Sequence, residues 1–146
     1  MTKHVLVTGG AGYIGSHACK ALKRAGYVPV TYDSLVTGWE QAVRFGPFAR
    51  GDPADRARLD EVFAKWRPVA VMHFAALSQV GEAMREPGKY WRGNVAASLT
   101  LLEAAVAAGC LDLVFSSTCA TYGDQDGVVL TEETPQAPIN AYGASK

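Results

Sequence analysis

The final residues of the chain pair a phenol with an ammonium group at a spacing that suits proton transfer. Tyr142 and Lys146 are four residues apart in the run Tyr-Gly-Ala-Ser-Lys. If this run is helical, both side chains share one face. A neighbouring cation favours the phenolate and lowers the pKa of a tyrosine from its usual value of about 10. Because such a tyrosine can act first as a general base and then as a general acid, we predict that Tyr142 is a catalytic base supported by Lys146.

A cluster of hydroxyl groups follows an apolar run that predicts a strand. Ser116, Ser117 and Thr118 stand at its end. Hydroxyls in this place can hydrogen-bond a substrate hydroxyl or carbonyl and hold it beside the tyrosine, although strand-end turn chemistry explains the same residue types. Cys119 comes next, but the sequence pairs no base with it. We therefore interpret its thiol as a small packing group and not as a nucleophile.

A glycine-rich turn near the N-terminus predicts a dinucleotide site. An apolar run over residues 5–8 leads into Gly9-Gly10-Ala11-Gly12-Tyr13-Ile14-Gly15 and then into a helical pattern. Two glycine spacings overlap here, one from Gly10 and one from Gly9, and both include Gly12 and Gly15. The glycines allow a tight turn and a close backbone approach to a pyrophosphate. The following helix directs its unpaired N–H groups and positive dipole end at the phosphates.

An acid at the end of the second apolar run completes this pattern. Asp33 closes the run over residues 28–33. A carboxylate about 20 residues beyond the glycines accepts hydrogen bonds from the adenosine ribose and repels a 2′-phosphate. Asp33 would otherwise only end a strand at a turn, but the fingerprint and the acid occur together in the expected order. The sequence therefore predicts NAD as the cofactor, in preference to NADP.

The remaining pattern alternates apolar runs with helical stretches and predicts an α/β fold. Right-handed crossovers would give a Rossmann-type, doubly wound parallel sheet of about five strands in the order 3-2-1-4-5. The glycine, aspartate and hydroxyl residues then fall at the carboxyl edge of the sheet, where such sheets bind ligands. We interpret residues 1–146 as one NAD-binding domain, which the sequence leaves incomplete. The expected strands cover residues 5–8, 28–33, 48–50, 69–76 and 113–117.

Helix details can also be predicted from the pattern. Asp52 suits an N-cap, with Pro53 at the first helical position. The helix that follows should bury Leu59, Val62, Phe63 and Trp66. The first helix should face the core with Ile14, Ala18, Ala21, Leu22 and Ala25. In a longer helix, which ends at Gly109, the residues predicted to face the core are Val95, Leu99, Leu102 and Val106.

Composition limits the classes of function. The 146 residues are 49% hydrophobic and 19% charged, with 14 basic and 14 acidic side chains, so no charge surplus points to nucleic acid. No apolar run approaches the roughly 20 residues that span a bilayer, and no signal peptide is expected. Three cysteines without a C-x-x-C spacing suit reduced thiols in the cytoplasm. The three histidines suggest no metal site.

Taken together, these motifs resemble the extended short-chain dehydrogenase/reductases, and within them the NAD-dependent epimerase/dehydratase family. The likeness runs through the whole chain. It rests on residues 8–17, 32–34, 51–52, 73–77, 80–82, 94–95, 115–123 and 142–146. Ser78 and Gly93 depart from residues that are common in the family at these positions.

The resemblance implies a role for individual residues. Thr118 falls at the catalytic Ser/Thr position, Tyr142 at the base, and Lys146 at the lysine that holds the nicotinamide ribose. Tyr13 and Ile14 would contact the pyrophosphate, and Asp33 the adenosine ribose. The cofactor-binding set that it implies is Gly9, Gly12, Tyr13, Ile14, Gly15, Asp33, Ser34, Asp52, Pro53, Phe74, Ala75, Ala76, Ser78, Asn94, Tyr142 and Lys146.

The resemblance also implies a reaction, the interconversion of UDP-glucose and UDP-galactose at C4 through a 4-keto sugar. A dehydratase would need an Asp-Glu pair where Cys119 and Ala120 stand. Other nucleotide-sugar enzymes of the superfamily, and a dinucleotide-binding module without turnover, remain alternatives. Because family members are roughly twice this length, we expect the UDP-sugar to be held by residues beyond this chain. The chain alone should bind NAD with little turnover, and we expect a homo-oligomer.

Overall fold

The structure, a computed structural model, describes residues 3–146 and divides into two compact units. The first unit comprises the chain up to Ala75 together with Ala97–Ser116. The second comprises Ala76–Ala96 and Ser117–Lys146. The glycine turn and Asp33 belong to the first unit, and Thr118, Tyr142 and Lys146 belong to the second.

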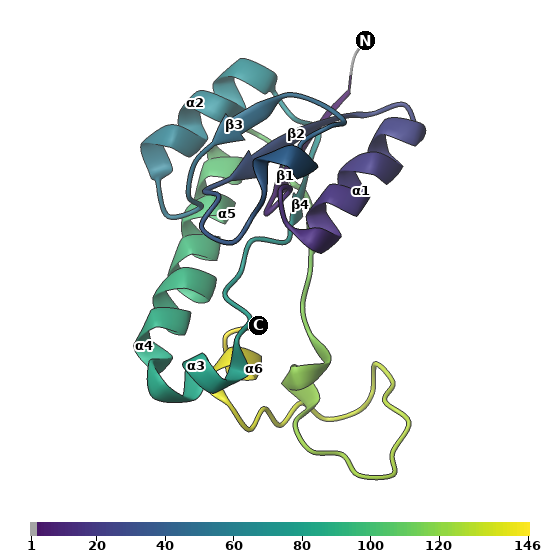
Figure 1. Cartoon of the computed structure of the whole chain (residues 1–146), viewed down its shortest axis with the longest axis vertical. Coiled ribbons are helices and arrows are strands. Elements are labelled where there is room, and N and C mark those ends of the chain that lie inside the picture. The colour runs from purple at the N-terminus through teal and green to yellow at the C-terminus, as the bar shows by residue number, and fades with distance from the viewer. Residues whose placement is uncertain (1–2) are drawn as a thin grey trace. The chain divides into compact units, whose positions relative to one another are not determined.

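A five-stranded sheet forms the centre of the first unit (Figure 1). Its strands are β1 (His4–Thr8), β2 (Val28–Asp33), β3 (Phe48–Arg50), β4 (Ala70–His73) and β5 (Asp112–Phe115). Their order is β3-β2-β1-β4-β5, and each neighbouring pair is parallel. The predicted fold class and strand order are confirmed. Parallel strands joined by crossovers bring the ends of β1, β2, β4 and β5 to one edge.

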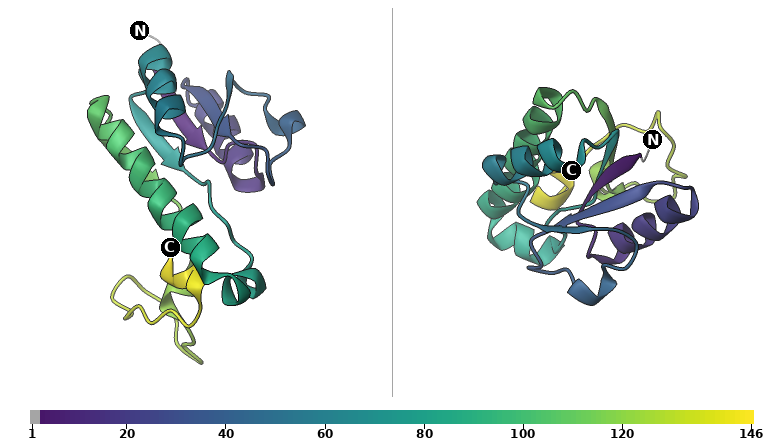
Figure 2. Two further views of the ribbon diagram at one scale, coloured as in Figure 1. Left: turned by 90° about the vertical axis from the view of Figure 1, so that its left-hand side faces the viewer. Right: turned by 90° about the horizontal axis from the view of Figure 1, so that it is seen from above.

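Helices cover both faces of this sheet. Helices α2 (Arg56–Trp66) and α5 (Ala97–Ala107) pack on one face, and α1 (Tyr13–Arg24) packs on the other (Figure 2). The larger core joins Leu6, Val30 and Val71 of the strands to side chains of α2 and α5. The smaller core joins Val5 and Val7 to Cys19 and Leu22 of α1. Burying one Leu or Val side chain stabilises the fold by about 1.5–3 kcal/mol. Because the apolar side chains of β1 are buried on both faces of the sheet, they bind it to the helices on each side.

The inward faces of two helices differ from those predicted, in part for α1 and throughout for α5. In α1 the buried residues are Gly15 and Cys19, and the predicted Leu22 packs against the core, while Ile14 is 60% exposed. In α5 the buried residues are Ala97, Leu101, Ala104 and Ala105, whereas the predicted inward residues Leu99 and Val106 are 56% and 64% exposed. Both inward faces rely on small residues, because glycine and alanine let a helix lie close to the sheet.

The start of α2 also differs from the prediction. The N-cap is Asp55, whose carboxylate accepts a hydrogen bond from the backbone N–H of Arg58 at 3.0 Å. Asp52 instead accepts from Ala54 at 2.9 Å, within the turn before the helix. The rest of α2 agrees with the prediction, since Leu59, Val62 and Phe63 are buried and Trp66 is half-buried.

The second unit consists of short helical segments. They are α3 (Val80–Arg85), α4 (Pro87–Tyr90), the π-helical η2 (Trp91–Ala96), the 3₁₀ turn η3 (Cys119–Tyr122) and α6 (Ala141–Ala144). A further 3₁₀ turn, η1 (Glu40–Ala42), belongs to the first unit. The predicted helical turn after residue 139 is present as α6, which packs against α3, α4 and η3.

Candidate functional site

The glycine turn after β1 has no room for side chains. Gly9 has φ +68°, a backbone conformation that suits glycine, and a Cβ there would lie 2.6 Å from the backbone nitrogen of Ala75. A Cβ on Gly15 would overlap the carbonyl oxygen of Gly9 and lie 2.8 Å from the Cα of Gly10. The Gly12 N–H donates to the Gly9 carbonyl at 3.0 Å, which closes the turn. Gly12 and Gly15 therefore let β1 and α1 meet at very short range.

The N-terminus of α1 is open to an anion. Gly12 is the N-cap and supplies no side-chain acceptor, and the first turn contains no acidic residue. Tyr13 and Ile14 are 83% and 60% exposed. Unpaired N–H groups and the helix dipole attract negative charge at this position. The turn thus has the donor set and the clearance that a pyrophosphate requires.

Asp33 is buried beside this turn. Its Oδ2 accepts from the backbone N–H of Ala11 at 3.0 Å and its Oδ1 from that of Leu35 at 2.9 Å. The side chain is only 8% exposed. The Gly9 N–H also donates to the carbonyl of Tyr32 at 2.9 Å. The end of β2 and the glycine turn are therefore joined through both backbone and side chain.

The backbone of Asp52 is hydrogen-bonded to a side chain near the end of β2. Its carbonyl accepts from the buried hydroxyl of Tyr32 at 2.9 Å, while its side chain is exposed. Of the other residues implied to bind the cofactor in the first unit, Ser34, Pro53, Phe74 and Ala75 are half-buried. In the second unit Ala76 is half-buried and Ser78 is exposed.

A buried histidine supports the turn, and sequence reasoning missed it. His73, at the end of β4, places Nδ1 2.5 Å from the Thr8 hydroxyl and Nε2 2.8 Å from the Ser98 hydroxyl. Thr8 directly precedes Gly9, and its hydroxyl is also 3.5 Å from the backbone nitrogen of Ala75. His73 thus connects the ends of β1 and β4 with α5 beneath the turn. The apolar surroundings of His73 in the sequence gave no indication of these partners.

The Tyr142 turn is fixed by polar side chains of the second unit. Asn140 caps α6 by accepting from the Gly143 N–H at 2.8 Å. The Ser145 hydroxyl donates to the Tyr142 carbonyl at 2.8 Å and accepts from the Asn94 amide at 2.9 Å. Because α6 has only four residues, these contacts take the place of the cooperativity that a longer helix would have.

Asn94, predicted as a cofactor-binding residue, is buried in η2 and holds two backbone segments together. Its Oδ1 accepts from the Leu77 N–H at 2.8 Å, and its Nδ2 donates to the Leu77 carbonyl at 3.0 Å and to Ser145. It therefore joins the segment after β4 to the Tyr142 turn. A π-helical turn often marks a functional position of this kind.

Lys146 is half-buried, and its burial lowers the pKa of its ammonium group from the usual value. Its backbone carbonyl accepts from the Ser117 hydroxyl at 3.2 Å. This contact joins the hydroxyl cluster after β5 to the end of the Tyr142 turn. A lysine with a lowered pKa, four residues after a tyrosine in the sequence, is a combination suited to acid–base chemistry.

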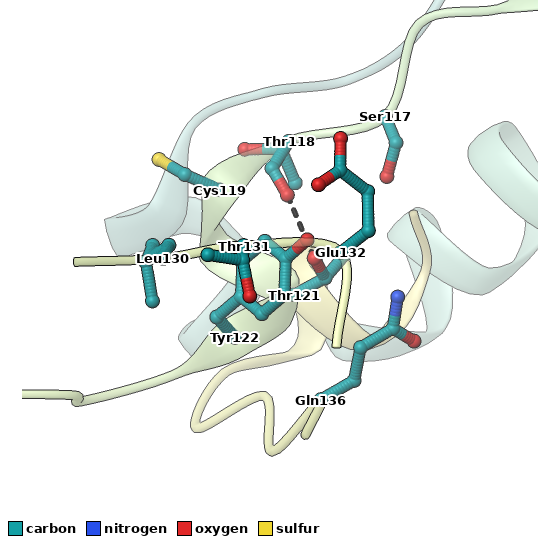
Figure 3. Close-up of a pocket in the computed structure, with 9 residues that line it drawn as sticks. All are labelled: Ser117, Thr118, Cys119, Thr121, Tyr122, Leu130, Thr131, Glu132 and Gln136. Atoms are coloured by element: carbon teal, nitrogen blue, oxygen red, sulfur yellow. Dashed lines mark hydrogen bonds between the residues drawn. The ribbon is translucent and has the colours of Figure 1, made fainter. Parts of the chain in front are cut away.

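A pocket of about 540 Å³ opens beside Thr118. Figure 3 shows the side chains that line it, which come from the two residues before η3, from η3 itself and from the loop that follows. Thr118 caps η3 by accepting from the Ala120 N–H at 3.2 Å, and its carbonyl accepts from the Thr121 hydroxyl at 2.8 Å. The lining residues are Ser117, Thr118, Cys119, Thr121, Tyr122, Leu130, Thr131, Glu132 and Gln136.

Comparison with known proteins decides the family. The model of the NAD dependent epimerase/dehydratase family matches residues 5–146. The chain belongs to this family. UDP-glucose 4-epimerase of Rhizobium meliloti is 53% identical over 143 residues, which cover 98% of this chain and 44% of that protein. UDP-arabinose 4-epimerase 1 of Arabidopsis thaliana is 44% identical over 153 residues, and this match covers 98% of this chain and 36% of that protein.

Solved structures of the epimerase/dehydratase family have the same fold. The crystal structure of UDP-glucose 4-epimerase from Brucella ovis in complex with NAD has a TM-score of 0.96 and 49% identity. The match covers 99% of this chain and 44% of that one. This chain thus spans less than half the length of the family members that it matches.

Among residues 3–146, no helix has both the length and the apolar character needed to cross a membrane. The same residues contain no group of three or more His, Cys, Asp or Glu side chains that could hold a metal ion.

Proposed function

We propose that this chain is the NAD-binding part of an epimerase that interconverts UDP-glucose and UDP-galactose at C4. The observation that carries the proposal is the open glycine turn beside buried Asp33, in a chain 49% identical to a UDP-glucose 4-epimerase that was crystallised with NAD. Residues 1–146 would form the cofactor domain. The remainder of a longer enzyme would hold most of the UDP-sugar, since the relatives extend well beyond the matched part.

In this proposal, separate residues of the chain bind the cofactor and transfer the proton. The glycine turn would hold the pyrophosphate, and Asp33 the adenosine ribose. Bound NAD would supply the acceptor and donor for the C4 hydrogen and its two electrons, so that C4 inverts without net oxidation. Tyr142 would take the proton of the 4-hydroxyl and later return it. Thr118 would hydrogen-bond the 4-oxygen, while Lys146 would favour the phenolate and hold the nicotinamide ribose.

A dehydratase is the less suitable alternative. Elimination needs an acid–base pair after the strand-end hydroxyl. Here Cys119 and Ala120 follow Thr118, and neither side chain can replace a carboxylic acid pair. A binding module without turnover is the second alternative, and it is separated from an epimerase by the experiments below.

The first experiment tests binding by the 146-residue chain. Native mass spectrometry of the 15.5 kDa chain, followed by calorimetric titration with NAD and NADP, should show one NAD per chain and weaker NADP binding. The absence of binding up to about 1 mM NAD, in a chain whose circular dichroism shows it folded, would contradict the proposal.

The second experiment tests catalysis. We define the fused enzyme as this chain joined to the C-terminal portion of the Rhizobium meliloti relative. It should convert UDP-galactose to UDP-glucose, and Tyr142→Phe should abolish that conversion. A folded fused enzyme that binds NAD and UDP-galactose without turnover would favour the binding module.

A further inference from the structure

Tyr90 is a buried tyrosine that neither the predicted motifs nor the proposed mechanism uses. It ends α4 and is fully shielded from solvent. Its ring meets that of Tyr142 edge-on, with centroids 6.4 Å apart and an interplanar angle of 78°. Aromatic rings favour this arrangement because the positive edge of one ring meets the negative face of the other. The phenol proposed as the base thus has an aromatic neighbour in the core of its own unit.

The hydroxyl of Tyr90 is fixed by contacts at the turn before α3. It accepts from the Gln79 N–H at 3.0 Å and lies 2.8 Å from the Gln79 carbonyl. The Glu82 carboxylate is a second acceptor at 2.9 Å. A buried hydroxyl with one donor and two acceptors has little freedom to rotate or shift. The ring that meets Tyr142 is therefore held at its far end.

The carboxylate behind Tyr90 is itself held by an ion pair. Lys89 Nζ lies 2.6 Å from Glu82 Oε1, while Tyr90 binds the other oxygen. The Lys89 and Tyr90 hydrogen bonds lower the pKa of Glu82 from its usual value, so this carboxylate stays ionised near neutral pH. A charged acceptor gives a stronger hydrogen bond than a neutral one. Glu82 and Lys89 thus stabilise the orientation of Tyr90.

Tyr142 needs such support because its own helix is one turn long. Asn140 and Ser145 fix the backbone of this turn, but neither contact restrains the χ angles of Tyr142. Tyr142 is only half-buried, so its ring would otherwise move between rotamers. A proton-transfer group must lie within hydrogen-bond distance of the reacting oxygen, and a shift of about 1 Å can reduce a rate roughly 100-fold.

We propose that Tyr90, anchored by Gln79 and Glu82, is a positioning residue that sets the ring orientation of Tyr142. The inference rests on the proposed function, because it gives Tyr142 the role of the base. Tyr90 touches neither the reacting atoms nor the cofactor in this role. It acts only through the ring of Tyr142.

Fluorine NMR on the 146-residue chain tests the positioning directly. The chain is labelled with 3-fluorotyrosine, and Tyr142→Phe assigns one of the six tyrosine signals to residue 142. Tyr90→Phe keeps an aromatic ring and its ring current but loses the hydroxyl anchors. We expect the Tyr142 signal to broaden or shift in this variant, while Tyr27→Phe, a change in the first unit, leaves it in place.

A Tyr142 signal that is unchanged in Tyr90→Phe overturns the proposal. Tyr90→Leu, which also removes the ring, should move the signal further toward that of free 3-fluorotyrosine. The other tyrosine signals report whether this harsher variant is folded. If Tyr90→Leu is unfolded, the Tyr90→Phe variant alone decides whether Tyr90 positions Tyr142.

The fused enzyme gives the second measurement. Tyr90→Phe should lower kcat for UDP-galactose about tenfold, with KM and the NAD dissociation constant within about twofold of the unsubstituted values. Equal kcat in Tyr90→Phe and Tyr27→Phe contradicts the inference but leaves the proposed function intact. An inactive fused enzyme with Tyr90 in place contradicts the proposed function, and the fluorine signal then decides the positioning alone.

Discussion

The carboxylate of Asp33 accepts a hydrogen bond from the backbone N–H of Ala11 at 3.0 Å. One residue at the end of β2 therefore fixes the middle of the glycine turn after β1. The second oxygen of Asp33 binds the N–H of Leu35, whose φ of +63° is unusual for a residue with a side chain. Asp33 thus organises the glycine turn and the loop that follows β2.

We expect Asp33→Asn to weaken both the fold and NAD binding. An amide is uncharged and has one acceptor oxygen. Both backbone N–H groups therefore lose a charged partner, and one of them also loses its acceptor. The free energy of unfolding should fall by about 1–3 kcal/mol. The preference for NAD over NADP should fall as well, because the charge that repels a 2′-phosphate is gone. Urea denaturation and titration with both cofactors measure these effects, and an unchanged preference would argue against the ribose role.

Gly15→Ala should disrupt the turn selectively. A Cβ at this position would overlap the Gly9 carbonyl, which cannot move without opening the turn. We expect NAD affinity to fall at least about tenfold, together with a loss of roughly 1–3 kcal/mol of stability. Gly26→Ala, at the other end of the same helix, is the matched control. Its φ of +86° makes the change cost stability too, but NAD affinity of the folded variant should be retained.

Thr118→Val should reduce catalysis by the fused enzyme more than it reduces stability. The hydroxyl of Thr118 caps η3, so its loss should cost about 1 kcal/mol. Loss of a hydrogen bond to the reacting oxygen should lower kcat roughly 100-fold. Thr118→Ser keeps the hydroxyl and should restore most of both properties. If valine and serine variants had equal kcat, Thr118 would be only a structural cap.

Alkaline pH should destabilise the first unit through Tyr32. Burial, followed by the nearby carboxylates of Asp55 and Asp52, raises the pKa of Tyr32 well above its usual value of 10. Above about pH 10 the unfolded chain releases this proton while the folded chain keeps it. Stability therefore falls as pH rises, by up to about 1.4 kcal/mol per pH unit.

Tyr32→Phe tests this pH dependence. It loses the hydrogen bond to the Asp52 carbonyl, so it should be about 1 kcal/mol less stable near neutral pH. Its loss of stability above pH 10 should nevertheless be shallower than that of the unsubstituted chain. Val30→Ala, a buried change without a titrating group, should lower stability at every pH and keep the original slope. Parallel slopes for Tyr32→Phe and the unsubstituted chain in urea denaturation would contradict the prediction.

The outer edge of β5 should promote self-association of the 146-residue chain. Among residues 3–146, β5 pairs only with β4, and all its residues are exposed. Unpaired strand edges form a template for another chain. Sedimentation velocity should show concentration-dependent association that Val114→Lys weakens and Val128→Lys, in an exposed loop of the second unit, does not. A monomer at all concentrations would show that the edge of β5 does not mediate self-association.

Local patterns were sufficient for much of the fold. Each apolar run is short and ends at glycine, aspartate or a hydroxyl residue, so the strands and their order followed from periodicity and from the right-handed crossover. The glycine turn and Asp33 were found because each depends on nearby residues. The Tyr142–Lys146 pair was predicted from its spacing, which is that of a single helical turn, although α6 itself ends at Ala144.

Other features depended on contacts between distant residues. The sequence of α5 is largely apolar, without a single apolar face, so periodicity could not show that Leu101 faces the core and Leu99 faces outward. Asp52 and Asp55 both suit a cap, and only the backbone geometry selected Asp55. The hydrogen bond from the Asn94 amide to the Ser145 hydroxyl joins residues that are 51 positions apart in the sequence.

The sequence by itself therefore determined the strand order, through its apolar runs and right-handed crossovers, and the glycine turn, through a few neighbouring residues. It also predicted Tyr142 and Lys146 as a proton-transfer pair. Only the tertiary structure decided which helix faces are buried and which side chains contact Tyr142. The edge-on contact of Tyr90 with Tyr142 joins two short helical segments that are too short to be stable alone. Their positions follow from the packing of the whole unit, which no local pattern records.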